Sequence, residues 1–131
     1  MKNLSIPDDF KDLFNIKSFA YLATIMPDGS PQVTPVWFDY DGEYIYINSA
    51  EGRQKDRNMK RDGRVALVVA DPEDPYRYIQ IRGRVREITS EKADEHIDNL
   101  SLKYTGNIFQ NRLPGQRRII YKIAIERVSI H

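Results

Sequence analysis

Apolar and polar residues alternate along most of this chain, which is the period of β-strands that have two different faces. The pattern predicts strands over residues 18–26, 31–40, 44–47, 65–70, 76–88 and 119–130. The segment 65–70, VALVVA, is apolar throughout. Because it is short and rich in β-branched residues, we expect a buried strand there and not a helix. The chain is therefore predicted to be mainly β.

Turn residues indicate how these strands connect. Asp41-Gly42 predicts a tight hairpin, because Gly supplies the positive φ that such a turn needs. Pro31 and Pro35 cannot donate ladder hydrogen bonds, so one edge of their strand must be unpaired or bulged. Gly83 predicts a bulge or a close backbone approach. Closure into a small antiparallel barrel best removes the free sheet edges.

Three segments are expected to be helical. Residues 6–14 carry Pro in the first turn and an apolar stripe. A second, short helix is expected after the strand at 44–47, with Asn48 or Ser49 as its N-cap. The third covers residues 89–103, with Thr or Ser as its cap and apolar residues spaced by three or four.

The start of the second helix is strongly basic. Its cations are Arg53, Lys55, Arg57, Lys60 and Arg61. Cations early in a helix oppose the helix dipole, at a cost of about a few tenths of a kcal/mol each. An anion bound there would reverse the sign of that interaction, because free N–H groups and several cations would face it. This pattern predicts a phosphate site, and a solvated basic face is the alternative.

Composition narrows the function classes. The length of 131 residues predicts one domain over 1–131, and the net charge of +1 gives no overall attraction to nucleic acid or anionic membranes. The chain has no cysteine, which excludes a cysteine nucleophile and is typical of a cytoplasmic protein, and it has no apolar run of membrane-spanning length. With only two histidines, a histidine-based metal site is not expected. His96 is expected on the exposed side of its helix, and neither it nor His131 is assigned a role.

The order of these motifs resembles a known family. The segments are FAYLATIMPDGSPQVTPVWF, YIYINSAEGRQKDRNMKRDGRVALVV and YRYIQIRGRVREI, which together cover about Phe19 to Glu87. They are similar to the pyridoxamine 5′-phosphate oxidase-like split barrels, and most of all to the small branch that binds FMN or the deazaflavin coenzyme F420. The most specific element is Arg53-x-Lys55 followed by Arg57-Asn58, just after a strand that ends in Asn48-Ser49.

The resemblance implies a six-stranded antiparallel split β-barrel that forms a homodimer, with two cofactors in clefts at the dimer interface. Arg53 and Lys55 would hold the cofactor phosphate, and the ring would lie against the strand at 35–37. Tyr78 and Gln80 of the partner would close the site. The cofactor-binding residues implied are Pro35, Val36, Trp37, Asn48, Ser49, Arg53, Lys55, Arg57, Asn58, Tyr78 and Gln80.

The function expected from this resemblance is hydride transfer between FMN or coenzyme F420 and a small organic substrate. The cofactor supplies that chemistry, which agrees with the lack of a catalytic triad or metal-ligand cluster in the sequence. The catalytic residues are not identified, and Tyr78 is the best candidate for a proton donor. Three alternatives stay open: a carrier or sensor without turnover, a true pyridoxamine 5′-phosphate oxidase, and a nucleic-acid-binding barrel. The C-terminal residues that bind the substrate phosphate in true oxidases are not found, which disfavours the oxidase alternative. The acidic residues Glu51, Asp56 and Asp62 interrupt the basic segment, which disfavours the nucleic-acid alternative.

Overall fold

The computed structural model of the protein describes residues 3–131. Its elements in chain order are η1 (Asp8–Phe14), β1 (Ala20–Ile25), β2 (Pro31–Val36), β3 (Phe38–Tyr40), β4 (Ile45–Ala50), α1 (Gln54–Arg61), β5 (Arg64–Asp71), β6 (Asp74–Thr89), α2 (Ala93–Thr105) and β7 (Arg118–Ile130). The element η1 is a short 3₁₀ helix. The mainly β prediction is confirmed.

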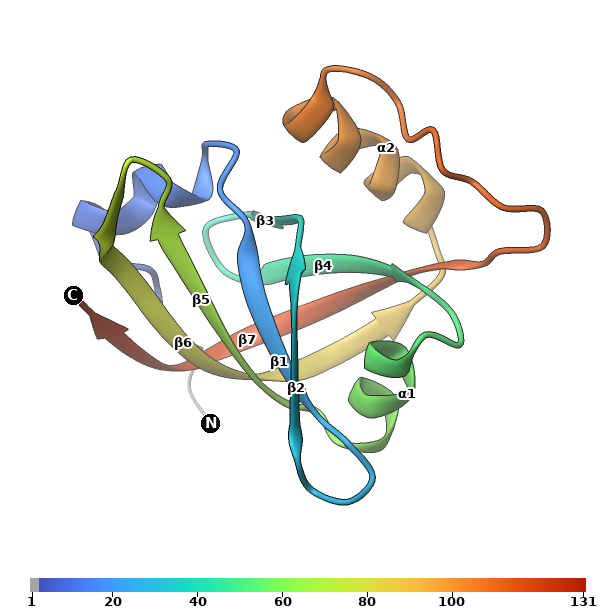
Figure 1. The fold of residues 1–131 in the computed structure, drawn as a ribbon, viewed down its shortest axis with the longest axis horizontal. Helices are drawn as coiled ribbons and strands as arrows, with labels where there is room; N and C mark the ends of the chain where they lie inside the picture. The colour runs from blue at the N-terminus through green and yellow to red at the C-terminus, as the bar shows by residue number, and fades with distance from the viewer. Residues whose placement is uncertain (1–2) are drawn as a thin grey trace.

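All strands belong to one antiparallel sheet, which has the order β2-β1-β5-β6-β7-β4-β3. Strands β2 and β3 therefore stand at opposite ends of this order, although only Trp37 separates them along the chain. The sheet has to curl until its two ends meet, which produces the half-open barrel in Figure 1. Trp37 is thus the residue at which the barrel closes.

The same corner explains why the structure has seven strands where six were expected. The expected strand over 31–40 is divided at Trp37, because its first half pairs with β1 and its second half with β4. Pro31 and Pro35 lie in the half at the sheet edge, where the missing N–H groups break no ladder. The hairpin at Asp41-Gly42 is confirmed: Asp41 N–H donates to Tyr44 O at 3.3 Å, and Gly42 has a φ of 95°.

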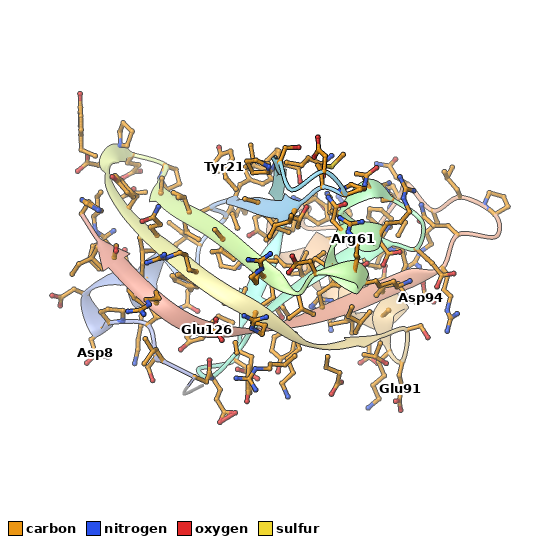
Figure 2. All side chains as sticks on the ribbon, turned by 90° about the horizontal axis from the view of Figure 1, so that it is seen from below. Asp8, Tyr21, Arg61, Glu91, Asp94 and Glu126 are labelled. Atoms are coloured by element: carbon orange, nitrogen blue, oxygen red, sulfur yellow. The ribbon has the colours of Figure 1, made fainter. Side chains whose placement is uncertain are left out.

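Apolar side chains from η1 and every strand fill the barrel interior. Phe38, Ile47 and Tyr121 are completely buried in it. Gly83 confirms the expected close approach in β6: the register with β7 shifts there, and a Cβ at this position would overlap the carbonyl of Ala124. Charged side chains such as Asp8, Glu91 and Asp94 lie at the periphery (Figure 2).

The helices begin later than the sequence indicated. Asn48 and Ser49 are not N-caps, because β4 continues through them to Ala50 in register with β7. Arg53 is the N-cap residue of α1, and its side chain makes no capping hydrogen bond. The helix α1 lies beside the β1–β2 hairpin (Figure 1). Within residues 3–131, no helix has both the length and the apolar character needed to cross a bilayer.

Candidate functional site

A cleft of about 300 Å³ lies where the barrel corner, the end of β4, the start of α1 and the segment before β7 come together. Its lining residues are Phe19, Pro35, Val36, Trp37, Asn48, Ser49, Arg53, Lys55, Ile97, Phe109, Asn111 and Arg118. The first part of the predicted cofactor set is thus brought together, from the 35–37 segment to Lys55. Residues 35–37 and Lys55 are almost 20 positions apart in the sequence. They line one cleft because β4 pairs with β3, the strand that follows Trp37.

One wall of the cleft is aromatic. The indole of Trp37 stacks on Tyr104 of α2, with ring centroids 5.3 Å apart and an interplanar angle of 6°. Phe19 stacks on Tyr104 at 5.8 Å. Phe109 meets Trp37 edge to face at 6.4 Å. Tyr104 is fixed by a hydrogen bond from its hydroxyl to Ser18 O at 2.6 Å. This wall offers a rigid flat surface to a planar ligand.

The same cleft is also lined by three cations, Arg53, Lys55 and Arg118. Burial, followed by the nearby Arg53 and Arg118 charges, lowers the pKa of Lys55. Burial, followed by Arg53 and Arg112, likewise lowers the pKa of Arg118. Within the described chain, none of the three forms an ion pair with a carboxylate. Like charges that repel one another across a cleft are stabilised when an anion enters it.

Arg118 was missed by sequence reasoning and is the most buried of these cations, at 7% exposure. Its Nε donates to Asn48 Oδ1 at 2.9 Å and its Nη1 to Gln116 Oε1 at 3.2 Å. Its guanidinium also lies 5.0 Å from the Phe109 ring centroid. A buried charge with only neutral partners is costly unless a counter-charge is supplied. The strand pattern gave no signal for it, because β7 alternates apolar residues from the next position onward.

Ser49 contributes an unsatisfied hydrogen-bonding group to the cleft. It is 3% exposed, and its hydroxyl is the buried side-chain polar atom of residues 3–131 that lacks a hydrogen-bond partner. Native proteins pair nearly all such groups, since an unpaired one costs about 1–3 kcal/mol. Ser49 lines the same cleft as Lys55, so a ligand oxygen in the cleft could accept its hydrogen bond. The unpaired hydroxyl of Ser49, the buried guanidinium of Arg118 and the ammonium of Lys55 together fit a phosphate group.

The remaining predicted residues do not line the cleft. Arg57 is exposed, and its guanidinium donates to Gly52 O and to Gln54 Oε1. Asn58 is fully buried and donates to Thr24 Oγ1 at 3.0 Å and to Met26 Sδ, which joins α1 to β1. Asn58 therefore has a visible structural role.

Tyr78 and Gln80 lie on β6, away from the cleft of their own chain. The ring of Tyr78 stacks on His131 at 4.6 Å. Gln80 is exposed on the outer face of the sheet. Both were expected to act on a partner's site, and nothing in a single chain places them there.

The expectation for His96 was wrong. Its ring does not face solvent: the side chain is 13% exposed and lies between Asp39 and Asn48. The helical spacing did place Ala93, Ile97 and Leu100 in the interior, but it could not show that β3 supplies a carboxylate beside this helix.

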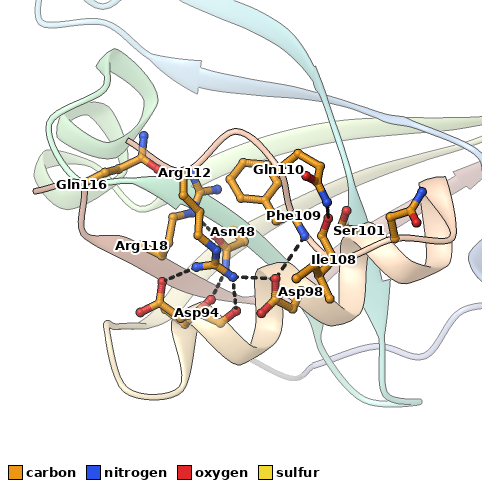
Figure 3. Close-up of polar contacts among 12 residues, drawn as sticks. Asn48, Asp94, Asp98, Ser101, Ile108, Phe109, Gln110, Arg112, Gln116 and Arg118 are labelled. Atoms are coloured by element: carbon orange, nitrogen blue, oxygen red, sulfur yellow. Dashed lines mark hydrogen bonds and ion pairs between the residues drawn. The ribbon is translucent and has the colours of Figure 1, made fainter. Parts of the chain in front are cut away.

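The connector between α2 and β7 is held to α2 by the polar contacts drawn in Figure 3. Arg112 bridges Asp94 and Asp98 of α2, at 3.0 and 2.5 Å. Phe109 N–H donates to Asp98 Oδ1 at 3.1 Å. These contacts hold the Phe109 ring between Trp37 and Arg118. Residues 3–131 contain no cluster of three or more side chains that could hold a metal ion.

Comparisons with known proteins agree with this geometry. The family model described as pyridoxamine 5′-phosphate oxidase matches residues 6–131. A solved structure named F420 reductase is 33% identical, covers 95% of this chain and 98% of its own, and has a TM-score of 0.86. An F420H(2)-dependent biliverdin reductase from Mycobacterium tuberculosis is 27% identical over 125 residues, which cover 94% of this chain and 86% of the relative.

A solved structure described as a putative pyridoxamine 5′-phosphate oxidase from Listeria innocua is 19% identical, covers 94% of this chain and 95% of its own, and has a TM-score of 0.71. At that identity the likeness supports the fold alone. The family match extends over nearly the whole chain and agrees with the split-barrel topology. The chain therefore belongs to the pyridoxamine 5′-phosphate oxidase family.

Proposed function

We propose that this protein is an oxidoreductase that binds coenzyme F420 or FMN through the cofactor phosphate and transfers hydride to or from a small organic substrate. The observation that supports this most directly is the cleft itself. It has a flat aromatic wall at Trp37, and it is also lined by Ser49, Lys55 and Arg118, which lack anionic partners in the described chain. A phosphate joined to a planar ring matches both features at once.

In this proposal the residues of the chain bind the cofactor and orient it. Arg53, Lys55 and Ser49 would hold the phosphate, and Arg118 would add a further positive charge. Pro35 and Trp37 would place one face of the ring against the barrel corner. When bound, the cofactor supplies the hydride chemistry.

Between the two cofactors, the relatives' names favour F420. The F420 reductase and the F420H(2)-dependent biliverdin reductase match this chain over nearly all of its length. FMN shares the tricyclic frame and the phosphate, so the cleft's chemistry accepts both. Biliverdin is accordingly the first organic acceptor to test.

We infer that the protein is a homodimer. The sheet register places Pro35, Tyr21, Val68 and Gln80 in one row across four neighbouring strands. With strands about 4.8 Å apart, Gln80 lies roughly 14 Å from Pro35 along the sheet, so the two side chains of one chain do not touch. A second copy packed on this face would bring its Gln80 and Tyr78 to that ring.

Exposed apolar groups on the same face support a partner there. Tyr21 is 48% exposed and Val33 is 63% exposed, on neighbouring strands. Light scattering should give a dimer mass for the wild type. Val33→Glu should shift it toward the monomer and weaken cofactor binding. Tyr76→Glu, at an 86% exposed site near the β5–β6 turn, is the matched control and should leave the dimer intact.

The test of the activity is a side-by-side titration of FMN and coenzyme F420, followed by visible absorbance. The reduced protein–cofactor complex is then mixed with biliverdin and with a panel of small organic acceptors. Tight binding with cofactor reoxidation supports the proposal. Binding without reoxidation by any acceptor would favour a carrier or sensor. The absence of binding to either cofactor would refute the proposal.

A further inference from the structure

We propose that His96 is a positioning residue for the anion site: in its neutral form it holds the Asn48 side-chain amide, and this amide holds the Arg118 guanidinium at the cleft wall. The inference rests on the proposed function because it concerns the same cleft. It goes further in assigning a role to a residue that touches neither the phosphate cations nor the aromatic wall.

A continuous series of hydrogen bonds carries the inference. Asp39 Oδ1 lies 2.9 Å from His96 Nε2. His96 Nδ1 lies 3.1 Å from Asn48 Nδ2. Asn48 Oδ1 accepts from Arg118 Nε at 2.9 Å. The series begins at a partly exposed carboxylate on β3 and ends at the buried guanidinium that lines the cleft.

The partners of Asn48 determine the proton positions. Its Nδ2 donates one hydrogen to Ala93 O at 2.9 Å, and the second hydrogen points to His96 Nδ1. Turning the amide over would set Nδ2 against the Arg118 donor and Oδ1 against the Ala93 carbonyl, and both contacts would be repulsive. His96 Nδ1 must therefore be an acceptor, which leaves the proton on Nε2, where it is donated to Asp39.

A second proton on His96 would break the series. Two N–H donors would then face each other where the 3.1 Å contact now stands. Asn48 would have to turn away, and Arg118 would lose the acceptor of its Nε. Arg118 already lies near the positive charges of Arg53 and Arg112. Without Asn48 it would therefore be less well held at the anion site.

Several groups face the imidazole. Asp39 lies at one end, and the Tyr46 ring is 6.4 Å away, edge to face. Glu87 and Lys122 line the same small hollow as His96. Burial, then the hydrogen bond to Asp41, raises the pKa of Tyr46, so its hydroxyl stays neutral. The charges facing His96 are thus the Asp39 and Glu87 carboxylates and the Lys122 ammonium.

The first test needs no ligand. In ¹⁵N-labelled protein, the Asn48 side-chain amide and the Arg118 Nε–H resonance are followed by NMR from about pH 8 to 5, the range in which histidine gains its second proton. Arg118→Lys assigns the resonance. Both signals should shift with the midpoint of the His96 ring signals. An Arg118 signal that stays constant while His96 titrates would overturn the proposal.

Variants sharpen the result. His96→Asn places an amide oxygen near the Nδ1 position and cannot titrate, so the Arg118 signal should match the wild type at pH 8 and stay flat. His96→Leu removes the acceptor, so the Arg118 signal should be displaced at every pH. A pH-dependent shift that persists in His96→Asn would assign the effect to another group and would also overturn the proposal.

The second test measures anion binding with sulfate, which remains a dianion over this pH range. Sulfate affinity of the wild type should fall about tenfold from pH 8 to 5, the scale of one charge-assisted contact, and should stay flat in His96→Asn. Equal pH profiles for the two proteins would contradict the positioning role. If neither sulfate, FMN nor F420 binds the wild type, the proposed function fails, and the NMR titration still decides the role of His96.

Discussion

The two faces of helix α1 differ sharply in how their polar groups are satisfied. On the barrel side, Asp56 and Asn58 are almost completely buried, and every contact they make is internal to the protein. On the cleft side, Arg53 and Lys55 have no carboxylate partner in the described chain. The polar groups of the barrel face are satisfied within the chain, whereas the cleft face presents cations for which we propose a ligand anion. The proposed site therefore rests on unsatisfied polar groups more than on residue type.

Asp56 is an example of a buried polar group whose hydrogen bonds are all made within the chain. It accepts hydrogen bonds from Tyr121 Oη at 2.5 Å and Gly52 N–H at 2.9 Å, and pairs with Lys60 at 3.1 Å. Burial would raise the pKa of its carboxyl, but these three contacts outweigh burial and lower it. The carboxylate thus fixes the start of α1 to the barrel core.

The largest expected effect is on the barrel side. Asp56→Ala should lower the free energy of unfolding by about 3 kcal/mol, because it leaves the buried Tyr121 hydroxyl without a partner and removes the bond to Gly52 N–H. Urea unfolding at neutral pH measures this. Asp62→Ala, which removes a partly exposed carboxylate whose hydrogen-bond partner is the exposed Arg64, should have a smaller effect. A similar loss for the two variants would break the contrast between the two faces.

On the cleft side, the effect should fall on binding and not on folding. Arg53→Ala or Lys55→Ala should each weaken FMN or F420 binding about ten- to a hundredfold, the range for one charge-assisted hydrogen bond. Stability should be unchanged or slightly raised, because mutual repulsion among cations is relieved. Calorimetric titration and urea unfolding of the same samples separate the two readouts.

Arg57→Ala is the matched comparison for these cations. Arg57 carries the same charge on the same helix, but its guanidinium is bound to Gly52 O and Gln54 Oε1. We expect its removal to weaken cofactor binding less than the removal of Arg53 or Lys55. An equal or larger loss of cofactor affinity in Arg57→Ala would show that Arg57 belongs to the phosphate site, as the sequence resemblance implied.

Ser49→Ala should give a smaller effect of the same kind. Removing a buried hydroxyl without a partner should leave the unliganded protein as stable as the wild type or slightly more stable. Cofactor affinity should fall by about 1 kcal/mol, or roughly fivefold. A loss of stability in the unliganded protein would show that Ser49 already has a partner.

The smallest predicted effect is the pH dependence of Asp56. Its pKa is lowered on folding, so its contribution to stability is present above its unfolded-state pKa and is lost as the pH falls through the folded-state value. Between neutral pH and about pH 3, the Asp56→Asn variant should therefore lose less stability than the wild type, by less than about 1 kcal/mol. Identical pH profiles would show that Asp56 gains nothing from its partners.

The sequence predicted much of the barrel because period-2 alternation, the Asp41-Gly42 turn and Gly83 are local signals with local causes. The division of one strand at Trp37 was not foreseeable, since it depends on which strands meet when the sheet closes. The basic segment indicated Arg53 and Lys55. Arg118 and Phe109 stayed hidden because tertiary contacts between distant segments bring them to the cleft. His96 stayed hidden for the same reason, because such contacts bring it to Asn48 and Asp39.

The central claim, that the cleft binds a phosphate joined to a planar ring, is tested most directly by comparing FMN with riboflavin, which has the same ring without the phosphate. Dissociation constants are measured for the wild type and for Arg53→Ala/Lys55→Ala. We predict that the wild type binds FMN at least a hundredfold more tightly than riboflavin, on the order of two charge-assisted contacts, and that the double variant loses most of this preference. Equal affinity of the wild type for the two ligands, or a preference unchanged in the double variant, would contradict the account.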